Sequence, residues 1–275
     1  MCKVLEVGRS GYYAWRKRGK SARSLENEVL LAEITEVFYT HHQIYGSPRI
    51  TEVLEDRGIK VSRPRVARLM RGAHLCSRVA RKFVPTTDSN HDLPICANVL
   101  NRQFEPGVPG YAWVSDITYI YTEEGWVYLT IFMDLADRKI IGWALSETME
   151  TQATLISAWN MACQNRKPTP GLIIHSDRGA QYASQEFRQQ LSRYPQLIQS
   201  MSRKGNCWDN APAEAFFKAL KTEWIYGHTF NNSQEAKRSI FQYIEIFYNR
   251  IRKHSSLGFR SPDQFFNQII RHQVA

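Results

Sequence analysis

Cysteine is scarce in this chain of 275 residues, and no two of its five cysteines stand in a C-x-x-C spacing. They are spread from Cys2 to Cys207, and their number is odd. Such a pattern argues against a disulfide framework and against a structural zinc site. We therefore expect reduced thiols and a cytoplasmic location.

Long apolar runs are also missing from the sequence. No stretch approaches the roughly 18 apolar residues that a membrane-spanning helix needs. The N-terminal residues MCKVLEVGRS lack the apolar centre and the cleavage site of a secretory signal. Hydrophobic residues still make up 43% of the chain, which is enough to build one large core or two to three small ones. We expect no membrane partner.

Negative charge is in deficit, and the deficit is uneven along the chain. The formal net charge is +10, with 18 Lys and Arg against 11 Asp and Glu in residues 1–108. Residues 109–225 hold 11 against 12, and residues 226–275 hold 7 against 3. A near-neutral middle between basic flanks suits a protein that grips a polyanion such as DNA by its flanks. A generically basic soluble protein would show the same totals.

The middle of the chain predicts an α/β domain with a mixed sheet. Aromatic and β-branched runs separated by short turns indicate three consecutive antiparallel strands. A helix and a short apolar run then predict a crossover to a strand parallel to the first. A further helix at 184–193, a strand at 197–201 and a helix carrying Glu214 complete the domain. The first five of these elements are predicted at residues 111–121, 126–133, 140–146, 151–164 and 171–174.

Three acids stand at informative places in these elements. Asp116 lies inside a predicted strand, where Asp is normally depleted, and Asp177 directly follows another strand. Glu214 lies in the first turns of a helix that begins near the cap residues Asp209 and Asn210. Three carboxylates from two strands and a helix form a set of oxygen ligands that Mg²⁺ prefers. For Asp116 alone, a satisfied polar residue on an edge strand is the alternative.

These residues carry a specific resemblance. The stretches WVSDITYI, HSDRGAQY and MSRKGNCWDNAPAEAFF-x-x-LKTE resemble the Asp-Asp-Glu transposases of the insertion sequence three family. YGSPRI at 45–50 and YN-x-x-R-x-H-x-x-L at 248–257 extend the resemblance over most of the chain. The spacing between the second and third acids is one residue longer than usual, and we place the extra residue in the loop 193–196. The zinc-binding module of retroviral integrases has no counterpart here.

The resemblance implies a ribonuclease-H-like integrase core and a defined chemistry. Asp116, Asp177 and Glu214 would hold two Mg²⁺ or Mn²⁺ ions, and the protein would cleave double-stranded DNA at transposon ends and join them to target DNA. Lys218 and Lys221, four and seven positions after Glu214, would contact the DNA end, although surface ion pairs are the simpler interpretation. The family also implies a homo-oligomer on DNA in the bacterial nucleoid. The chain looks like a second-frame product, with the first-frame product as its partner.

The N-terminal part predicts DNA contacts of its own. We divide it into a basic, aromatic arm and helix at 1–40, a helix-turn-helix-like region at 41–75 and a linker at 76–109. The arm either contacts DNA or is a flexible end. In the second region, one helix closes at Gly58 and another opens at Ser62, with Arg65, Arg68 and Arg71 on its polar face. We predict that these arginines grip phosphates, and a solvated basic face is the alternative.

Further basic residues lie in and after the predicted core at 110–225. Arg203 and Lys204 precede the Glu214 helix, and Arg252 and Lys253 follow an amphipathic helix in the predicted helical extension at 226–275. We predict that all four face DNA.

Other charged or titratable residues have simpler interpretations. Asp134 sits at a turn, and we interpret it as structural. His175 is interpreted as a packed side chain. Two rival functions stay open: a ribonuclease-H-like nuclease that does not join strands, and a catalytically silent DNA-binding relative.

Overall fold

The structure is a computed structural model that describes residues 2, 4–77, 93–194 and 196–274. It divides into two compact units, residues 1–78 and 79–275. Within the described residues, no helix is both long and apolar enough to cross a membrane.

The first unit is helical. Val37 and Phe38 of α2 are buried together with Ile50 and Leu54 of α3 and Val66 of α4. Gly58 ends α3 in a left-handed conformation, with φ of +79°, as the sequence indicated. The basic, aromatic tip of the chain is itself helical, and α1 has no buried residue. The helices are α1 (Arg9–Lys17), α2 (Ala22–Thr40), α3 (Ser47–Asp56) and α4 (Arg63–Gly72).

The second unit is built on a five-stranded sheet in the order β3-β2-β1-β4-β5. β1, β2 and β3 pair antiparallel, whereas β4 lies parallel to both β1 and β5. The predicted meander and crossover are confirmed, and this is the mixed sheet expected of a ribonuclease-H-like core. The strands are β1 (Ala112–Thr122), β2 (Gly125–Asp134), β3 (Ile140–Ser146), β4 (Ile173–Ser176) and β5 (Ile198–Met201).

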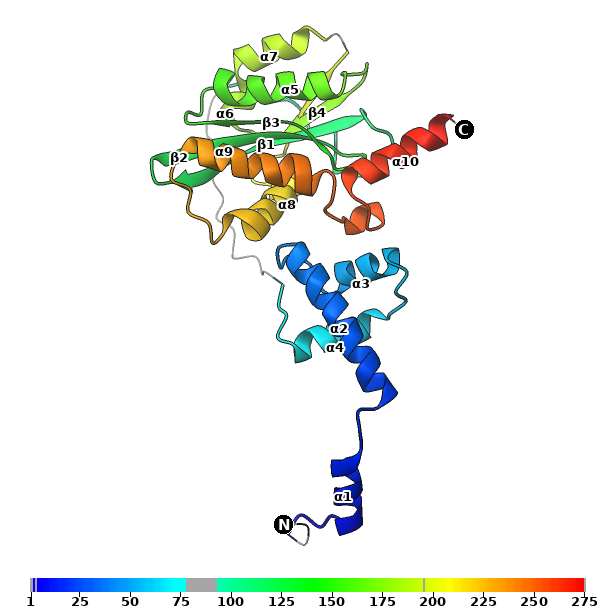
Figure 1. Cartoon of the computed structure of the whole chain (residues 1–275). Helices are drawn as coiled ribbons and strands as arrows, with labels where there is room; N and C mark the ends of the chain where they lie inside the picture. Colours follow the sequence, from blue (N-terminus) through cyan, green and yellow to red (C-terminus); the bar gives the residue numbers. More distant parts are fainter. Residues whose placement is uncertain (1, 3, 78–92, 195, 275) are drawn as a thin grey trace. The chain divides into compact units, whose positions relative to one another are not determined.

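Helices cover both faces of the sheet (Figure 1). α5 and α7 lie on one face, where Trp159 and Phe187 pack with Trp113 and Phe132 of the strands. Gly142 allows the close approach of α5, because a Cβ there would lie 2.3 Å from the Ala158 carbonyl oxygen. The helical elements of the second unit up to residue 192 are η1 (Gln152–Ile156, a π turn), α5 (Ser157–Asn165), α6 (Ala180–Ala183) and α7 (Gln185–Ser192).

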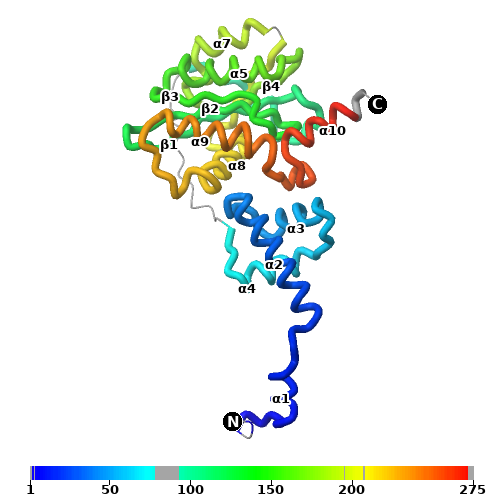
Figure 2. The backbone as a smooth tube through the Cα atoms, viewed as in Figure 1, coloured from blue at the N-terminus to red at the C-terminus, as the bar shows by residue number. Residues whose placement is uncertain are grey.

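α8 and α9 follow one another along the opposite face (Figure 2). Ala213, Phe217 and Leu220 of α8 recur at helical spacing and are fully or almost fully buried, so they form the apolar face of this helix. The elements of this last part are η2 (Cys207–Asn210), α8 (Ala211–Leu220), η3 (Lys221–Ile225, a π turn), α9 (Ser233–Phe241), η4 (Gln242–Tyr248, π), η5 (Ser255–Leu257) and α10 (Pro262–Val274).

The predicted linker is described only in part, since residues 78–92 lie outside the described residues. Residues 93–109 form neither helix nor strand, yet they pack against the core. Leu100 is fully buried, and the backbone N–H groups of Val99 and Leu100 donate to the Ser200 hydroxyl at 2.9 and 3.1 Å. The sequence did not indicate this docking. Pro195, in the loop assigned the extra residue, also lies outside the described residues.

Candidate active site

The parallel pairing of β1 and β4 brings two of the predicted acids together. Val114 pairs with His175, and Asp116 and Asp177 each follow these partners by two positions. β4 ends at Ser176, and its pairing with β1 ends at the pair Val114 and His175. The two strands are therefore no longer paired where the acids stand. An opening between neighbouring parallel strands is the usual place for a ligand in such sheets.

The third acid comes from α8. Asn210, directly before this helix, donates from Nδ2 to the Ser115 carbonyl at 3.2 Å, which ties the helix start to β1. Because Ala213 and Phe217 are turned into the core, Glu214 lies at the flank of α8 and is only half-buried. The charge of Asp177 acts on Glu214, and the charge of Glu214 acts on Asp116, so the three acids lie near one another.

The pKa values of these carboxyl groups report their mutual repulsion. Burial raises the pKa of Asp116 well above its ordinary value, and the charges of Asp177 and Glu214 raise it further. The Ile117 N–H and the Lys221 ammonium oppose this shift without cancelling it. Burial and Asp177 likewise raise the pKa of Glu214. The three acids form a cluster in which repulsion contributes to the raised pKa values of Asp116 and Glu214.

Backbone N–H groups hold the two aspartates in place. Asp116 Oδ1 accepts from Ile117 N at 2.8 Å, and Asp177 Oδ1 accepts from Gly179 N at 2.9 Å. A Cβ at Gly179 would lie 3.1 Å from that same Oδ1, so a larger residue would crowd the carboxylate. Arg178, which stands between Asp177 and Gly179 in the sequence, donates from Nε to the Ser202 carbonyl at 2.7 Å. This bond fixes the loop after β4.

The donor set fits magnesium or manganese. All three side chains offer carboxylate oxygens, whereas zinc sites rely largely on His and Cys. Among the described residues, no three His, Cys, Asp or Glu side chains are close enough to hold one ion together. Mg²⁺ does not require that, because it keeps several waters and uses one or two protein carboxylates plus substrate phosphate oxygens. Pairs of acids within the cluster match this mode of binding.

The basic helix face predicted beside Glu214 is only partly present. Lys218 is exposed on α8, but Lys221 is 8% exposed, and its Nζ lies 4.8 Å from the centre of the Tyr119 ring. The reason is a tertiary contact. The Lys221 N–H still donates to the Phe217 carbonyl, so the residue keeps the phase of α8, and its side chain packs against Tyr119 of β1. Burial lowers the pKa of Lys221, and the nearby Asp116 raises it.

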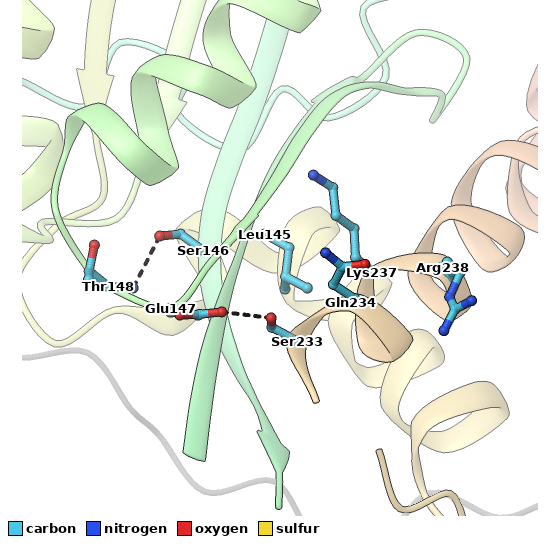
Figure 3. A pocket seen from close by; sticks show the side chains of 8 residues that line it. All are labelled: Leu145, Ser146, Glu147, Thr148, Ser233, Gln234, Lys237 and Arg238. Carbon is cyan, nitrogen blue, oxygen red and sulfur yellow. Dashed lines mark hydrogen bonds between the residues drawn. The ribbon is translucent and has the colours of Figure 1, made fainter. Parts of the chain in front are cut away.

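A polar pocket of about 550 Å³ lies elsewhere in this unit, between the end of β3 and the start of α9 (Figure 3). Ser233 Oγ donates to Glu147 Oε1 at 2.6 Å across it, and Lys237 and Arg238 contribute to its wall. None of the three acids lines it. This open pocket and the acidic site are separate features.

Comparison with known proteins agrees with this architecture. Family models described as integrase core domain match residues 108–207 and 214–270, and a model described as HTH-like domain matches residues 24–83. The chain is 44% identical over 275 residues to the insertion element IS600 uncharacterized 31 kDa protein of Shigella sonnei, covering 100% of both chains. It is 40% identical over 270 residues to transposase InsF for insertion sequence IS3A of Escherichia coli K12, covering 98% of this chain and 93% of that relative.

The chain belongs to the IS3-family transposases. Among solved structures, the HTLV-2 integrase catalytic core domain in complex with magnesium is 15% identical, with a TM-score of 0.41 and coverage of 57% of this chain and 97% of that one. The assignment of the core rests on the two family models and on the strand order.

Arg252 and Lys253, which were predicted to face DNA, are buried and half-buried respectively. Arg252 is 7% exposed, and it donates from Nε to Glu223 Oε2 at 2.7 Å and from Nη2 to Glu223 Oε1 at 2.5 Å. Tyr243 also donates to Glu223 Oε2, at 2.9 Å. Lys253 is half-buried and donates to the Phe259 carbonyl at 3.3 Å. The prediction that Arg252 faces DNA is therefore corrected: this arginine neutralises a buried acid.

The YN-x-x-R motif as a whole is structural in this transposase. Asn249 accepts from the Ile140 N–H at 3.0 Å and donates to the Ile140 carbonyl at 2.9 Å, so it continues the pairing of β3. Arg252 of the same motif reaches Glu223 in the LKTE stretch. No local sequence pattern indicates this pairing, because its two partners are 29 positions apart.

Asp209 is a second anchoring point that sequence reasoning missed. It was expected to cap α8, but it is fully buried and accepts from Arg203 N, Nε and Nη2 at 3.0, 2.8 and 2.7 Å. Arg102 Nε and Asn98 Nδ2 add bonds at 2.8 and 2.9 Å. Arg203 is thus engaged with Asp209, while Lys204 beside it is exposed.

In the helical unit, the three predicted arginines also differ. Arg65 donates from Nε and Nη2 to Asn27 Oδ1 at 2.9 and 2.7 Å and from Nη1 to Glu26 Oε1 at 3.0 Å. It therefore joins α4 to α2. Arg68 and Arg71 are exposed.

Two residues interpreted as structural have structural surroundings. Asp134 is fully buried and accepts from Gly110 N, Trp113 Nε1 and Arg166 Nη1 at 2.7, 3.1 and 2.5 Å. His175 is fully buried, and its Nδ1 lies 2.9 Å from Ser200 Oγ. Burial lowers the pKa of His175 to about 4, so the ring is neutral near pH 7.

Proposed function

We propose that this transposase cleaves and joins DNA at a two-metal site held by Asp116, Asp177 and Glu214. Asp116 is central, because the charges of both other acids raise its pKa. It would ligate both ions, with Asp177 and Glu214 each completing one. When bound, such a pair of ions activates an oxygen nucleophile and stabilises the leaving oxygen of a phosphodiester.

The reaction has two steps of the same kind. First, water attacks the phosphodiester at an end of the element, and the bond to the 3′ oxygen breaks to leave a free 3′-hydroxyl. That hydroxyl then attacks a phosphodiester of the target, and the target's own 3′ oxygen leaves. The carboxylates fix the geometry at phosphorus, and no protein side chain becomes covalently linked to DNA.

The observation that supports this proposal is the mutual repulsion of the three acids, which contributes to the raised pKa values of Asp116 and Glu214. A silent DNA-binding relative would have no reason to keep three mutually repelling carboxylates at a strand opening, since their repulsion costs stability. A nuclease without strand transfer would need the same site. The family to which the chain belongs favours joining as well as cleavage.

The exposed basic residues near the site are proposed to hold the DNA. Lys218 and Lys204 are exposed, and Arg203 is half-exposed while bound to Asp209. Buried Lys221 would act at short range beside Asp116. Arg68 and Arg71 would hold phosphates from the HTH-like region, which extends the DNA contact beyond the catalytic domain.

We also propose that the protein acts as an oligomer on DNA, with or without the first-frame product. Two DNA ends must be joined in a coordinated way, and each chain offers one acidic cluster. Light scattering of the protein with and without terminal DNA measures the oligomer directly.

The test is a strand-transfer assay with pre-cleaved ends and Mg²⁺. Asp116→Asn, Asp177→Asn and Glu214→Gln should each lower cleavage and joining on the order of 10²-fold or more. Glu186→Gln, an exposed acid on α7, is the matched control and should leave both reactions unchanged. Near-normal joining by any one triad variant would remove that residue from the site. Cleavage without joining by the wild-type protein would favour the nuclease.

A further inference from the structure

Four aromatic side chains share one face of the β1–β2 hairpin. Tyr119 pairs with Tyr128, and Tyr121 pairs with Trp126, in the antiparallel register. Directly paired residues lie on the same face, and residues two apart along a strand do as well. We call Tyr119, Tyr121, Trp126 and Tyr128 the aromatic strip.

The outer half of the aromatic strip is open to solvent. Tyr121 is 57% exposed and Trp126 is 50% exposed, whereas Tyr119 and Tyr128 are half-buried. The Trp126 ring meets the rings of Tyr119 and Tyr121 edge-on, with centroids 4.8 and 5.2 Å apart. The rings therefore brace one another while retaining exposed surface. Grouped, exposed aromatic side chains on a soluble domain mark a surface that binds something.

The aromatic strip and the acidic site are linked through Lys221. Asp116 and Tyr119 are three positions apart and so lie on opposite faces of β1. Lys221 lies near both, because its Nζ is 4.8 Å from the Tyr119 ring centre and its charge lowers the pKa of Asp116. β1 pairs with β4 only from Ala112 to Val114, so on that side its outer half is not covered by β4. At about 3.3 Å per residue, Tyr121 lies about 17 Å from Asp116 along the strand. That distance equals about five base steps of DNA.

We propose that the aromatic strip is a stacking platform for unpaired nucleotides next to the cleaved bond. The inference rests on the proposed function, because the scissile phosphate must then lie at Asp116 and the DNA beside it must pass nearby. Aromatic rings stack on any base, so such a platform needs no sequence preference. Glu123 and Glu124 at the hairpin turn repel phosphates and so limit the strip to base contacts on its inner side.

The experiment compares two DNA duplexes that carry the end sequence of the element. One is fully paired, and the other has its last three base pairs replaced by mismatches, with 2-aminopurine in the unpaired strand. Binding is measured without divalent metal, so that no cleavage occurs. The wild-type protein should prefer the unpaired end and quench the 2-aminopurine fluorescence.

Two substitutions test the aromatic strip. Trp126→Ala and Tyr121→Ala should each lower the preference for the unpaired end on the order of tenfold and restore the fluorescence. Tyr121→Phe, which keeps a ring, should behave as wild type. Phe241→Ala removes an aromatic side chain that is 49% exposed on α9, and it should change neither measurement.

Three results with Trp126→Ala and Tyr121→Ala would overturn the inference. Both variants could keep the preference for the unpaired end, they could bind both duplexes with equally reduced affinity, or they could still quench the 2-aminopurine fluorescence. Failure here is distinct from failure of the proposed function. If the triad variants are inactive while Trp126→Ala keeps the wild-type preference, only the aromatic strip is wrong. If the triad variants stay active, the proposed site is wrong whatever the strip does.

Discussion

Three acids lie along the sequence at and around α8, and their electrostatic surroundings differ. Two of them lie beside arginines, whereas the third lies beside other acids. Asp209 before the helix is bound by Arg203 and Arg102, and Glu223 after it is bound by Arg252. Glu214 between them faces other acids, and its pKa is raised, whereas hydrogen bonds from Arg203 depress the pKa of Asp209. The chain neutralises the acids that anchor the two ends of the helix. It leaves the acid in between beside other acids, as the proposed metal site requires.

The strongest test of this contrast removes the Glu223 partner. Arg252→Ala removes the arginine partner of the buried Glu223 carboxylate, and the free energy of unfolding should fall by about 3–5 kcal/mol. Arg250→Ala, an exposed arginine two positions earlier, should change it by less than about 0.5 kcal/mol. Chemical denaturation of both variants measures the difference. Equal small effects would mean that Arg252 does not stabilise the fold, and the DNA-contact interpretation would return.

The sequence predicted the sheet and the acids because both have local signals. The aromatic and β-branched runs mark β1 to β3, and an Asp inside a strand or directly after one is conspicuous. The ion pairs have no such signal, since Arg102 and Asp209 are 107 positions apart. The burial of Lys221 has no local signal either, because it comes from packing against Tyr119 of β1, in a distant part of the sequence.

Substitution of Asp209 should have the next largest effect on the free energy of unfolding, and this effect should depend on pH. Its folded-state pKa is depressed, so its stabilisation is present above the unfolded-state pKa of about 3.9 and disappears as the pH falls. Asp209→Asn should cost about 1–3 kcal/mol at pH 7 and progressively less below about pH 4. Urea unfolding of wild type and variant at several pH values measures this. A difference that is independent of pH would contradict the ionic interpretation.

The active-site acids should show the opposite sign in metal-free protein. The pKa of Asp116 is raised, so its ionised form destabilises the fold, and this penalty grows as the pH rises above about 4. Asp116→Asn should therefore be more stable than wild type by about 1 kcal/mol at pH 7, with a smaller gain at pH 4. Added Mg²⁺ should stabilise wild type and not the variant. Thermal unfolding in chelator and in Mg²⁺ decides the question, and destabilisation by Asn in chelator would show that Asp116 is a satisfied structural residue.

The smallest effects separate two arginines on α4. Arg65 is bound to Asn27 and Glu26, whereas Arg68 is exposed. Arg65→Ala should therefore lower the stability of the helical unit by a small but measurable amount, because its bonds join α4 to α2. Arg68→Ala should leave stability within about 0.5 kcal/mol and reduce the salt dependence of DNA binding by about one phosphate contact. Thermal unfolding and binding over a range of salt concentrations measure both variants. If Arg65→Ala alone changed the salt slope, its bonds to α2 would be secondary to DNA, and the distinction between satisfied and available charge would fail in this unit.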